Sequence, residues 1–465
     1  MINFFRNTNH IHFIGIGGIG MSGMAEFLHN HGFIISGSDI KKTERTKFLE
    51  QCGINISYVH DSKNITKCDL IVFSSAVKKS NPEIKKGKIK NIPIIKRAEL
   101  LGELIKIKEI SIAVAGTHGK TTTSSMLGNI LFEYNLNPTL IIGGIVNKFN
   151  SNNISGSGNI IVVEADEFDK SFLSLSPIFS IINNLDLEHT DIYKNLNILK
   201  KTFLKFSNSV PFYGKTFLNA DCRNLNHIIE NINRPKTTYG IYKNADIKAS
   251  SIKYNNSKST FTLNNKKDKI IINLNCPGEH NIYNALAAAT VSIELDIPIN
   301  YIKKGLESYS GVKRRFEIKY ECKKNNIMIV DDYAHHPSEI SATLNAAKKG
   351  WEKKITAIFQ PHLFSRTKNF YSDFAKALMI ADNVIITDIY KAREKPIKGV
   401  SSQLIIDEMH SMNYKKIDYI NEIEKIPEKI KNIVIKNNII IFMGAGNINS
   451  IISSTIKNIE KKTNL

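Results

Sequence analysis

A glycine-rich turn between two hydrophobic segments carries the residues best suited to chemistry in this chain. Gly116-Thr117-His118-Gly119-Lys120-Thr121-Thr122 follows an apolar, β-branched run at residues 110–115 and precedes an apolar-spaced segment at 124–134. A strand, a glycine turn and a helix together let backbone N–H groups and a helix N-terminus meet phosphate oxygens. We therefore predict a nucleoside triphosphate site, with Lys120 reaching the β- and γ-phosphates and the Thr121 hydroxyl holding Mg²⁺.

Acidic residues follow two further strand-like segments. Residues 160–163 run into Glu164-Ala165-Asp166-Glu167, and residues 179–183 lead into a polar run that contains His189. At the carboxyl end of a strand in a phosphate-loop domain, such side chains are placed to coordinate Mg²⁺. We predict a metal site that includes Glu164 and His189. The alternatives are a solvated acidic loop and an ordinary loop histidine.

A second glycine motif lies near the N-terminus. Gly15-Ile16-Gly17-Gly18-Ile19-Gly20 separates a strand-like segment at 10–14 from a helical pattern at 21–31, and Asp39 comes 19 residues after Gly20. On its own this pattern is the dinucleotide fingerprint and favours NAD. The motif specifies a pyrophosphate or a close backbone approach, however, and does not specify a nicotinamide. We predict a small Rossmann-like domain here.

The C-terminal third also contains strand-like segments that end in polar or glycine-rich residues. Four apolar segments, at 327–330, 355–359, 383–387 and 439–442, each end in polar or glycine-rich residues, which predicts an α/β sheet with a ligand crevice along its carboxyl edge. The polar stretch at 219–275 contains short alternating runs, which favour edge strands with antiparallel pairing. An alanine-rich segment at 282–295 is expected to be helical.

The composition fits an ordinary globular protein of about three domains, with 465 residues and 42% hydrophobic residues. The formal charge of +20 is dispersed along the chain, so we do not expect nucleic-acid binding. Five scattered cysteines argue against a zinc cage or a disulfide framework. Without a signal pattern or an 18-residue apolar stretch, we expect a cytoplasmic protein that has no membrane partner.

Taken together, these motifs resemble the bacterial muramyl ligases along essentially the whole chain. The resemblance rests on the two glycine motifs, on Glu164 to Glu167, and on four later segments. These are Gly278-Glu-His-Asn-Ile-Tyr-Asn-Ala285, Gly311-Val-Lys-Arg-Arg-Phe-Glu317, Asp331-Asp-Tyr-Ala-His-His-Pro-Ser-Glu339 and Gly444-Ala-Gly-Asn-Ile448. It implies a three-domain α/β architecture. Residues 1–108 would form a Rossmann-like UDP-sugar domain, 109–311 a phosphate-loop ATPase domain, and 312–465 a Rossmann-like domain for the amino acid.

The resemblance also implies the reaction, which is ATP-dependent ligation of L-alanine to the carboxylate of UDP-N-acetylmuramate through an acyl phosphate. The implied cofactors are ATP and Mg²⁺, and the chain would be a monomer or a weak homodimer. The catalytic residues would be Lys120, His189, His335 and Arg366, with Thr121, Glu164 and His189 on the metal. ATP would also contact His280, Asn281 and Asn284. The substrates would contact Gly15, Gly17, Gly18, Ile19, Gly20, Asp39, Ser75, Glu167, Arg314, Tyr333, His335, His362 and Arg366.

The sequence departs from the commonest family pattern at three positions. Glu188 stands where aspartate is usual, Phe168 where serine is usual, and Leu363 where many members have arginine. Three alternatives remain open: a sister muramyl or folate-type ligase with another acceptor amino acid, an NAD-dependent oxidoreductase, and a catalytically weakened nucleotide-binding relative. The oxidoreductase alternative leaves Lys120 and Glu164 without a role.

Overall fold

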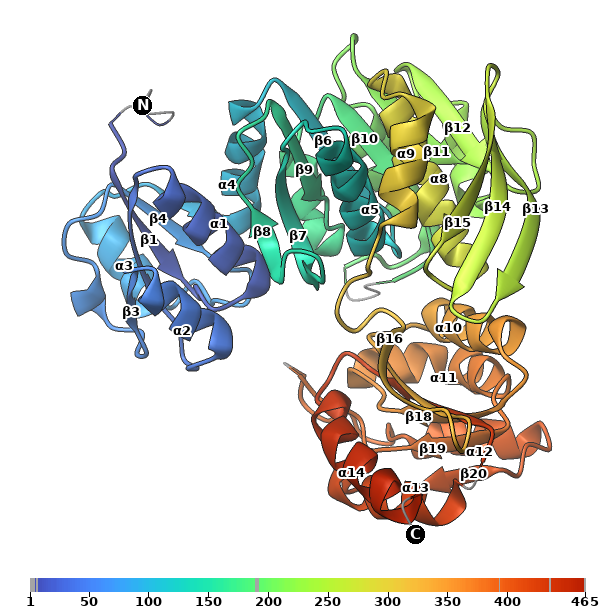
Figure 1. Ribbon diagram of the computed structural model, residues 1–465. Coiled ribbons are helices and arrows are strands. Elements are labelled where there is room, and N and C mark those ends of the chain that lie inside the picture. The colour runs from blue at the N-terminus through green and yellow to red at the C-terminus, as the bar shows by residue number, and fades with distance from the viewer. Residues whose placement is uncertain (1–4, 6, 189–191, 393, 435, 464–465) are drawn as a thin grey trace.

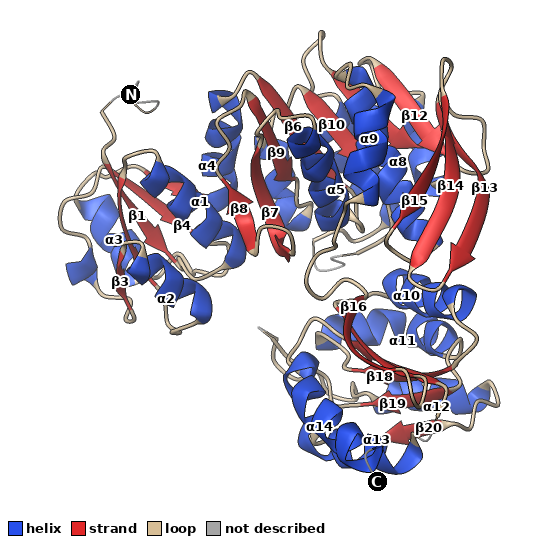
Figure 2. Cartoon of the chain, in the orientation of Figure 1, coloured by secondary structure: helices blue, strands red, loops and turns tan. Residues whose placement is uncertain are grey.

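Three α/β units follow one another along the chain, each built around its own sheet (Figures 1 and 2). The computed structural model describes residues 5, 7–188, 192–392, 394–434 and 436–463. In Figure 1 the N-terminal and C-terminal units lie on different sides of the central unit, which carries the largest sheet. The three-domain α/β architecture expected from the sequence is confirmed.

The first unit is a five-stranded parallel sheet in the order β3-β2-β1-β4-β5. The strand order reverses between β1 and β4, and open α/β sheets bind their ligands at the carboxyl ends of the strands at such a point. Its strands are β1 (His10–Ile14), β2 (Ile34–Ser38), β3 (Asn55–Ser57), β4 (Leu70–Phe73) and β5 (Ile94–Lys96), and its helices are α1 (Ile19–Asn30), α2 (Glu44–Gln51), α3 (Pro82–Ile89) and α4 (Arg97–Leu104).

The central unit has a ten-stranded sheet in the order β15-β14-β13-β12-β11-β10-β6-β9-β7-β8. Its strands are β6 (Ile110–Ala115), β7 (Thr139–Val146), β8 (Ser151–Ile154), β9 (Ile160–Glu164), β10 (Phe179–Ile182), β11 (Lys215–Asn219), β12 (Lys236–Gly240), β13 (Ile247–Asn255), β14 (Lys258–Asn264) and β15 (Lys269–Leu274). Its helices are α5 (Lys120–Glu133), α6 (Leu196–Ser207), α7 (Arg223–Ile229), α8 (Glu279–Glu294) and α9 (Ile299–Glu307). The pairing is antiparallel at the two ends of the sheet, at β7–β8 and at β13–β14–β15.

The third unit is a six-stranded sheet in the order β16-β17-β21-β18-β19-β20, parallel except for β16. Its strands are β16 (Glu317–Cys322), β17 (Ile327–Asp332), β18 (Lys354–Phe359), β19 (Asn383–Ile386), β20 (Ile417–Tyr419) and β21 (Asn438–Met443), and its helices are α10 (Pro337–Gly350), α11 (Phe364–Leu378), α12 (Gln403–Ser411), α13 (Ile426–Ile433) and α14 (Ile452–Thr463). The four strands predicted from the sequence are confirmed as its parallel core.

Two sequence expectations need correction. The helix expected at 124–134 begins four residues earlier, at Lys120, because Gly119 adopts a left-handed φ of 79° as its N-cap and the following threonines are buried. Within 219–275, the antiparallel pairing is right for β13 to β15, whereas β12 pairs in parallel with both β11 and β13.

The hydrophobic cores show that the units are joined in different ways. Leu100, Leu101 and Leu104 of α4 belong to one cluster that also contains Ala113, Ile161 and Phe172 of the central unit. The third unit has its own clusters on the two faces of its sheet. Among the helices that the structure describes, none has the length and apolarity needed to cross a membrane.

Gly305 provides a test of the packing behind the phosphate loop. A Cβ at Gly305 of α9 would lie 2.5 Å from the Ile130 Cα in α5, so an added methyl group must push two helices apart. We expect Gly305→Ala to destabilise the central unit by about 1–3 kcal/mol, although alanine favours a helix. The control is Gly23→Ala in α1, whose Cβ would meet neighbours only at 3.4 Å. Thermal unfolding should separate the two variants, and equal melting temperatures would contradict this packing.

Candidate active site

The phosphate loop is shaped by close contacts that only glycine allows. It leaves β6 at Gly116, with a φ of 126°, and enters α5 through Gly119. A Cβ at Gly119 would lie 2.4 Å from the Asn284 Oδ1, which accepts a hydrogen bond from the Thr123 hydroxyl at 3.1 Å. The N-terminal part of α8 therefore touches the loop directly, and it brings His280, Asn281 and Asn284 to the same place as the glycines.

Lys120 is held inside the loop. Its Nζ donates to the Gly116 carbonyl at 2.7 Å and to the Glu167 carboxylate at 2.8 Å. Burial opposes the charged form of Lys120, but the Glu167 and Asp166 carboxylates outweigh it and raise the lysine pKa. Burial raises the pKa of Glu167 to about 7, with Lys120 opposing the shift. The amine is thus a charged group with a carboxylate partner that a bound phosphate could replace.

The described part of the predicted metal site combines the end of β9 with the first turn of α5. Glu164 ends β9, and its Oε1 accepts a hydrogen bond from the Gly143 N–H at 2.6 Å. Burial raises the Glu164 pKa, while the Gly143 N–H, a hydrogen bond to Thr121 and the Lys120 charge all lower it. A buried carboxylate beside a threonine hydroxyl is a donor set suited to Mg²⁺. His189 lies outside the described residues. Among those described, no three His, Cys, Asp or Glu side chains gather as a metal cluster.

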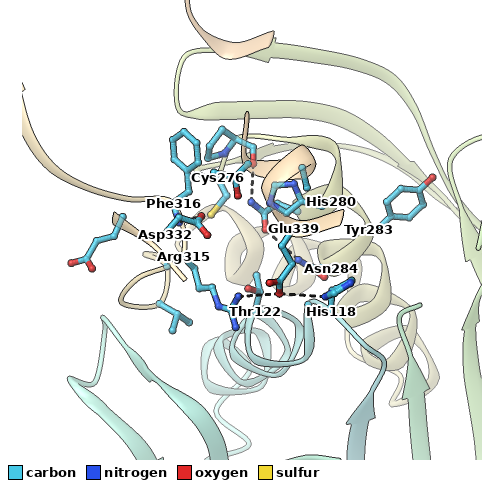
Figure 3. Close-up of a pocket in the computed structure, with 18 of the residues that line it drawn as sticks. His118, Thr122, Cys276, His280, Tyr283, Asn284, Arg315, Phe316, Asp332 and Glu339 are labelled. Carbon is cyan, nitrogen blue, oxygen red and sulfur yellow. Dashed lines mark hydrogen bonds and ion pairs between the residues drawn. The ribbon is translucent and has the colours of Figure 1, made fainter. Parts of the chain in front are cut away.

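A cavity of about 590 Å³ opens beside the phosphate loop, between the central and third units (Figure 3). His118, Gly119 and Thr122 line it from the loop, and His280, Asn281 and Asn284 line it from α8. Arg315, Asp332 and Glu339 contribute to its wall from the third unit and the segment that enters it. Burial lowers the pKa of His280 to about 4, with the Arg315 charge adding to the effect, so the imidazole that faces the cavity is neutral.

His118 points toward two carboxylates. Its Nε2 lies 3.5 Å from the Asp186 Oδ2 and its Nδ1 lies 3.3 Å from the Glu339 Oε1. Burial alone would lower the His118 pKa, but Asp186 and Glu339 together raise it to about 10. The phosphate loop therefore carries, besides Lys120, a histidine whose charged form these two carboxylates favour.

The predicted alanine-side residues of the third unit meet the central unit at Glu188. The Arg366 Nη2 lies 2.6 Å from the Glu188 Oε1, and both side chains are 7% exposed. The His335 Nε2 lies 3.8 Å from the same Glu188 oxygen, and the His362 Nδ1 lies 3.2 Å from the Arg366 Nη1. Tyr333 lies close by, with its ring 5.2 Å from the His335 ring. The structure thus brings together Tyr333, His335, His362 and Arg366, and their role at the alanine site stays a prediction.

The comparisons with known proteins assign the family. Three Mur ligase profiles match in succession: the "Mur ligase family, catalytic domain" at residues 10–109, the "Mur ligase middle domain" at 114–292, and the "Mur ligase, glutamate ligase domain" at 314–446. The chain belongs to the Mur ligase family. The first and third matched ranges contain the first and third sheets, and the second contains the central sheet except for residues 110–113 of β6.

Relatives of this Mur ligase match over nearly their full length. A UDP-N-acetylmuramate–L-alanine ligase of Trichlorobacter lovleyi is 44% identical over 96% of this chain and 97% of its own. The crystal structure of the UDP-N-acetylmuramate–alanine ligase of Thermotoga maritima has a TM-score of 0.81 and 31% identity, covering 98% of this chain and 99% of that one. A murein peptide ligase of Psychrobacter arcticus is more distant, with a TM-score of 0.71, 25% identity and coverage of 97% and 98%.

The N-terminal glycine motif of this Mur ligase forms a separate site on the first sheet. Gly15, with a φ of 81°, ends β1, and the Gly17 N–H donates to the Asp39 Oδ2 at 2.8 Å. Ile19 and Gly20 begin α1, with Gly18 as the N-cap, and Ser75 is exposed just after β4. Asp39 therefore stabilises the glycine loop through a hydrogen bond. The sequence predicted Asp39 only as a substrate contact.

Arg315, the neighbour of the predicted Arg314, also belongs to the site. The Arg314 Nη2 donates to the Gly444 carbonyl at 2.6 Å and its Nε lies 3.5 Å from the Asp331 Oδ1, whereas Arg315 lines the cavity. Asp186 and Glu339 were also missed as site residues. For Glu339, the capping pattern His336-Pro337-Ser338-Glu339 was a signal in the sequence that its carboxylate caps a helix. Leu363 is 8% exposed with a φ of 71°, so this apolar side chain is packed away from solvent.

Glu164→Gln tests the metal prediction. The side-chain carbonyl of the introduced glutamine can still accept the Gly143 N–H, but a neutral amide is a poorer ligand for a hard cation. We expect the Mg²⁺ concentration for half-maximal phosphate release to rise at least about fivefold. The control is Glu294→Gln, which removes a carboxylate paired with Lys215 elsewhere in the central unit. An unchanged Mg²⁺ requirement in Glu164→Gln would remove this residue from the metal site.

Proposed function

We propose that this chain ligates L-alanine to the carboxylate of UDP-N-acetylmuramate, converting ATP to ADP and phosphate and giving UDP-N-acetylmuramoyl-L-alanine. The observation that carries the proposal is the crevice between the central and third units. There Glu188 of the central unit lies 2.6 Å from Arg366 and 3.8 Å from His335 of the third unit, and its charge also acts on Lys120 of the phosphate loop. The full-length relatives with this named activity support the same substrates.

A carboxylate is a poor electrophile, so the first step is its activation. The γ-phosphoryl group of ATP is transferred to a carboxylate oxygen of UDP-N-acetylmuramate, and ADP leaves. Lys120 and His118 supply positive charge where negative charge spreads over the phosphoryl oxygens. Mg²⁺, held by Thr121, Glu164 and His189, would neutralise charge on the phosphate chain.

The second step forms the amide. The amine of L-alanine attacks the acyl carbon, and phosphate leaves with the electrons of the broken C–O bond. Arg366 can pair bidentately with the alanine carboxylate and so orient the amine. The His335 Nε2 faces the crevice near Glu188, where it can accept the proton that the attacking amine must lose.

The nucleotide sugar would be anchored on the first unit, with its diphosphate at the N–H groups of the glycine loop from Gly15 to Gly20. Its muramate carboxylate must then reach the crevice beside Lys120. Because the reaction consumes ATP and a nucleotide sugar, we place it in the cytoplasm. A sister ligase with another acceptor is the second candidate, but its support is the more distant relative.

An amino-acid panel tests the acceptor directly. With ATP, Mg²⁺ and UDP-N-acetylmuramate, we expect L-alanine to give a product heavier by one alanyl residue, detected by mass spectrometry, together with equimolar ADP. Glutamate, diaminopimelate and D-alanine should give none. Preferential turnover of any of these would establish a sister ligase instead, and ATP hydrolysis without an adduct would indicate a weakened relative.

Lys120→Ala separates catalysis from binding of the nucleotide sugar. We expect ligation to fall at least about a hundredfold, because a cation at the transferring phosphoryl group is lost. UDP-N-acetylmuramate binding, measured by calorimetry, should stay within threefold of wild type because that site lies on the first unit. Lys106→Ala, which removes an exposed lysine paired with Glu103, is the control. Ligation close to wild type in Lys120→Ala would exclude the lysine from the mechanism.

A further inference from the structure

Glu339 divides its two carboxylate oxygens between two different tasks. The residue lies in the first turn of α10, just after β17, and its side chain is 12% exposed. In Figure 3 it points between Arg315 and His118 on the cavity wall. The contacts of each oxygen are separate, so the role of each can be examined in turn.

The Oε2 atom caps a helix. It accepts hydrogen bonds from the backbone N–H groups of His335 at 3.0 Å and His336 at 3.3 Å, as the reciprocal half of a capping box. It also lies 3.1 Å from the His335 Nδ1. These contacts are all within the third unit and secure the start of α10.

The Oε1 atom contacts two basic side chains that line the cavity. It lies 3.3 Å from the His118 Nδ1 and 3.7 Å from the Arg315 Nη1. His118 belongs to the phosphate loop of the central unit, and Arg315 belongs to the segment that joins α9 to β16. One oxygen therefore holds two cations that come from different parts of the chain and border the same cavity.

We propose that Glu339 is a positioning residue of the ATP site, holding the His118 imidazole and the Arg315 guanidinium on the wall of the nucleotide cavity. The inference rests on the proposed function, because it takes the cavity to be the ATP site. Glu339 belongs to the third unit, whereas the loop that it orients belongs to the central unit. The nucleotide site is consequently complete only when the third unit is docked on the central one.

The Glu339→Gln substitution separates the two tasks. The amide oxygen of the introduced glutamine can take the place of Oε2 and keep the capping hydrogen bonds, since glutamine also serves at this position of a capping box. The NH₂ group of the glutamine then replaces Oε1. It is a hydrogen-bond donor without charge, so it cannot hold the His118 imidazole and the Arg315 guanidinium. Alanine removes both tasks at once.

The experiment is calorimetric titration of the full-length chain with ATP and Mg²⁺, without UDP-N-acetylmuramate or alanine. We expect Glu339→Gln to weaken ATP binding at least tenfold while its melting temperature stays within about 2 °C of wild type. Glu339→Ala should weaken binding equally and also melt at a lower temperature, because the cap is lost. UDP-N-acetylmuramate binding should stay within threefold of wild type in both variants.

A double-mutant cycle distinguishes positioning from a general loss of order. We compare the fold-loss in ATP affinity that Glu339→Gln causes in the wild type with the fold-loss that it causes in a His118→Ala background. The second fold-loss should be at least about three times smaller than the first. The control is Glu408→Gln, the same substitution at a third-unit carboxylate that accepts the Ser372 hydroxyl at 2.7 Å. Wild-type ATP affinity in Glu339→Gln, or an undiminished effect in the His118→Ala background, would overturn the proposal. ATP binding by a wild-type chain that forms no alanyl product would instead contradict the proposed function alone.

Discussion

The site depends on two mainly parallel sheets whose carboxyl edges meet at a polar crevice. On the central side, β6, β9 and β10 end at the phosphate loop, at Glu164 and at the segment leading to Glu188. On the other side, β17 ends at the loop that carries His335, and β18 leads to the first turn of α11, which carries Arg366. Because the parallel strands of each sheet share their polarity, their carboxyl ends deliver side chains to the same edge of that sheet. The meeting of these two edges allows a phosphoryl donor and an amine to reach one carboxylate.

The junctions between the units differ in physical character. The first and central units share a continuous apolar cluster through α4, and separating them would expose that surface to water. The central and third units meet through ion pairs, among them Glu188 with Arg366 and His118 with Glu339. A polar junction can open and close at lower cost in apolar exposure. The ligands that the crevice is proposed to bind can replace these ion pairs one for one, as when an alanine carboxylate takes the place of Glu188.

Much of this arrangement could be predicted from the sequence, because a buried strand followed by glycine or polar residues is a local signal. The strands at 110–115, 160–163 and 439–442 were predicted from their apolar sequence alone, and each leads into a polar or glycine-rich loop. The early start of α5 was missed because three threonines disfavour a helix locally, whereas burial against α8 and α9 stabilises it. Arg315, Asp186 and Glu339 were missed because their roles come from contacts between units, which no local pattern records. The cavity position of Arg315 could not be predicted beside Arg314, because only the backbone decides in which direction each of two adjacent arginines points.

The most direct test follows an oxygen atom through the reaction. UDP-N-acetylmuramate labelled with ¹⁸O in its muramate carboxylate is incubated with the chain, ATP, Mg²⁺ and L-alanine, and the released phosphate is analysed by mass spectrometry. If the crevice activates the carboxylate by phosphoryl transfer, the bond that breaks on amide formation leaves one carboxylate oxygen on phosphorus. The account therefore predicts one ¹⁸O atom in each phosphate released from fully labelled substrate. Phosphate without the label, formed alongside the alanyl product, would contradict it.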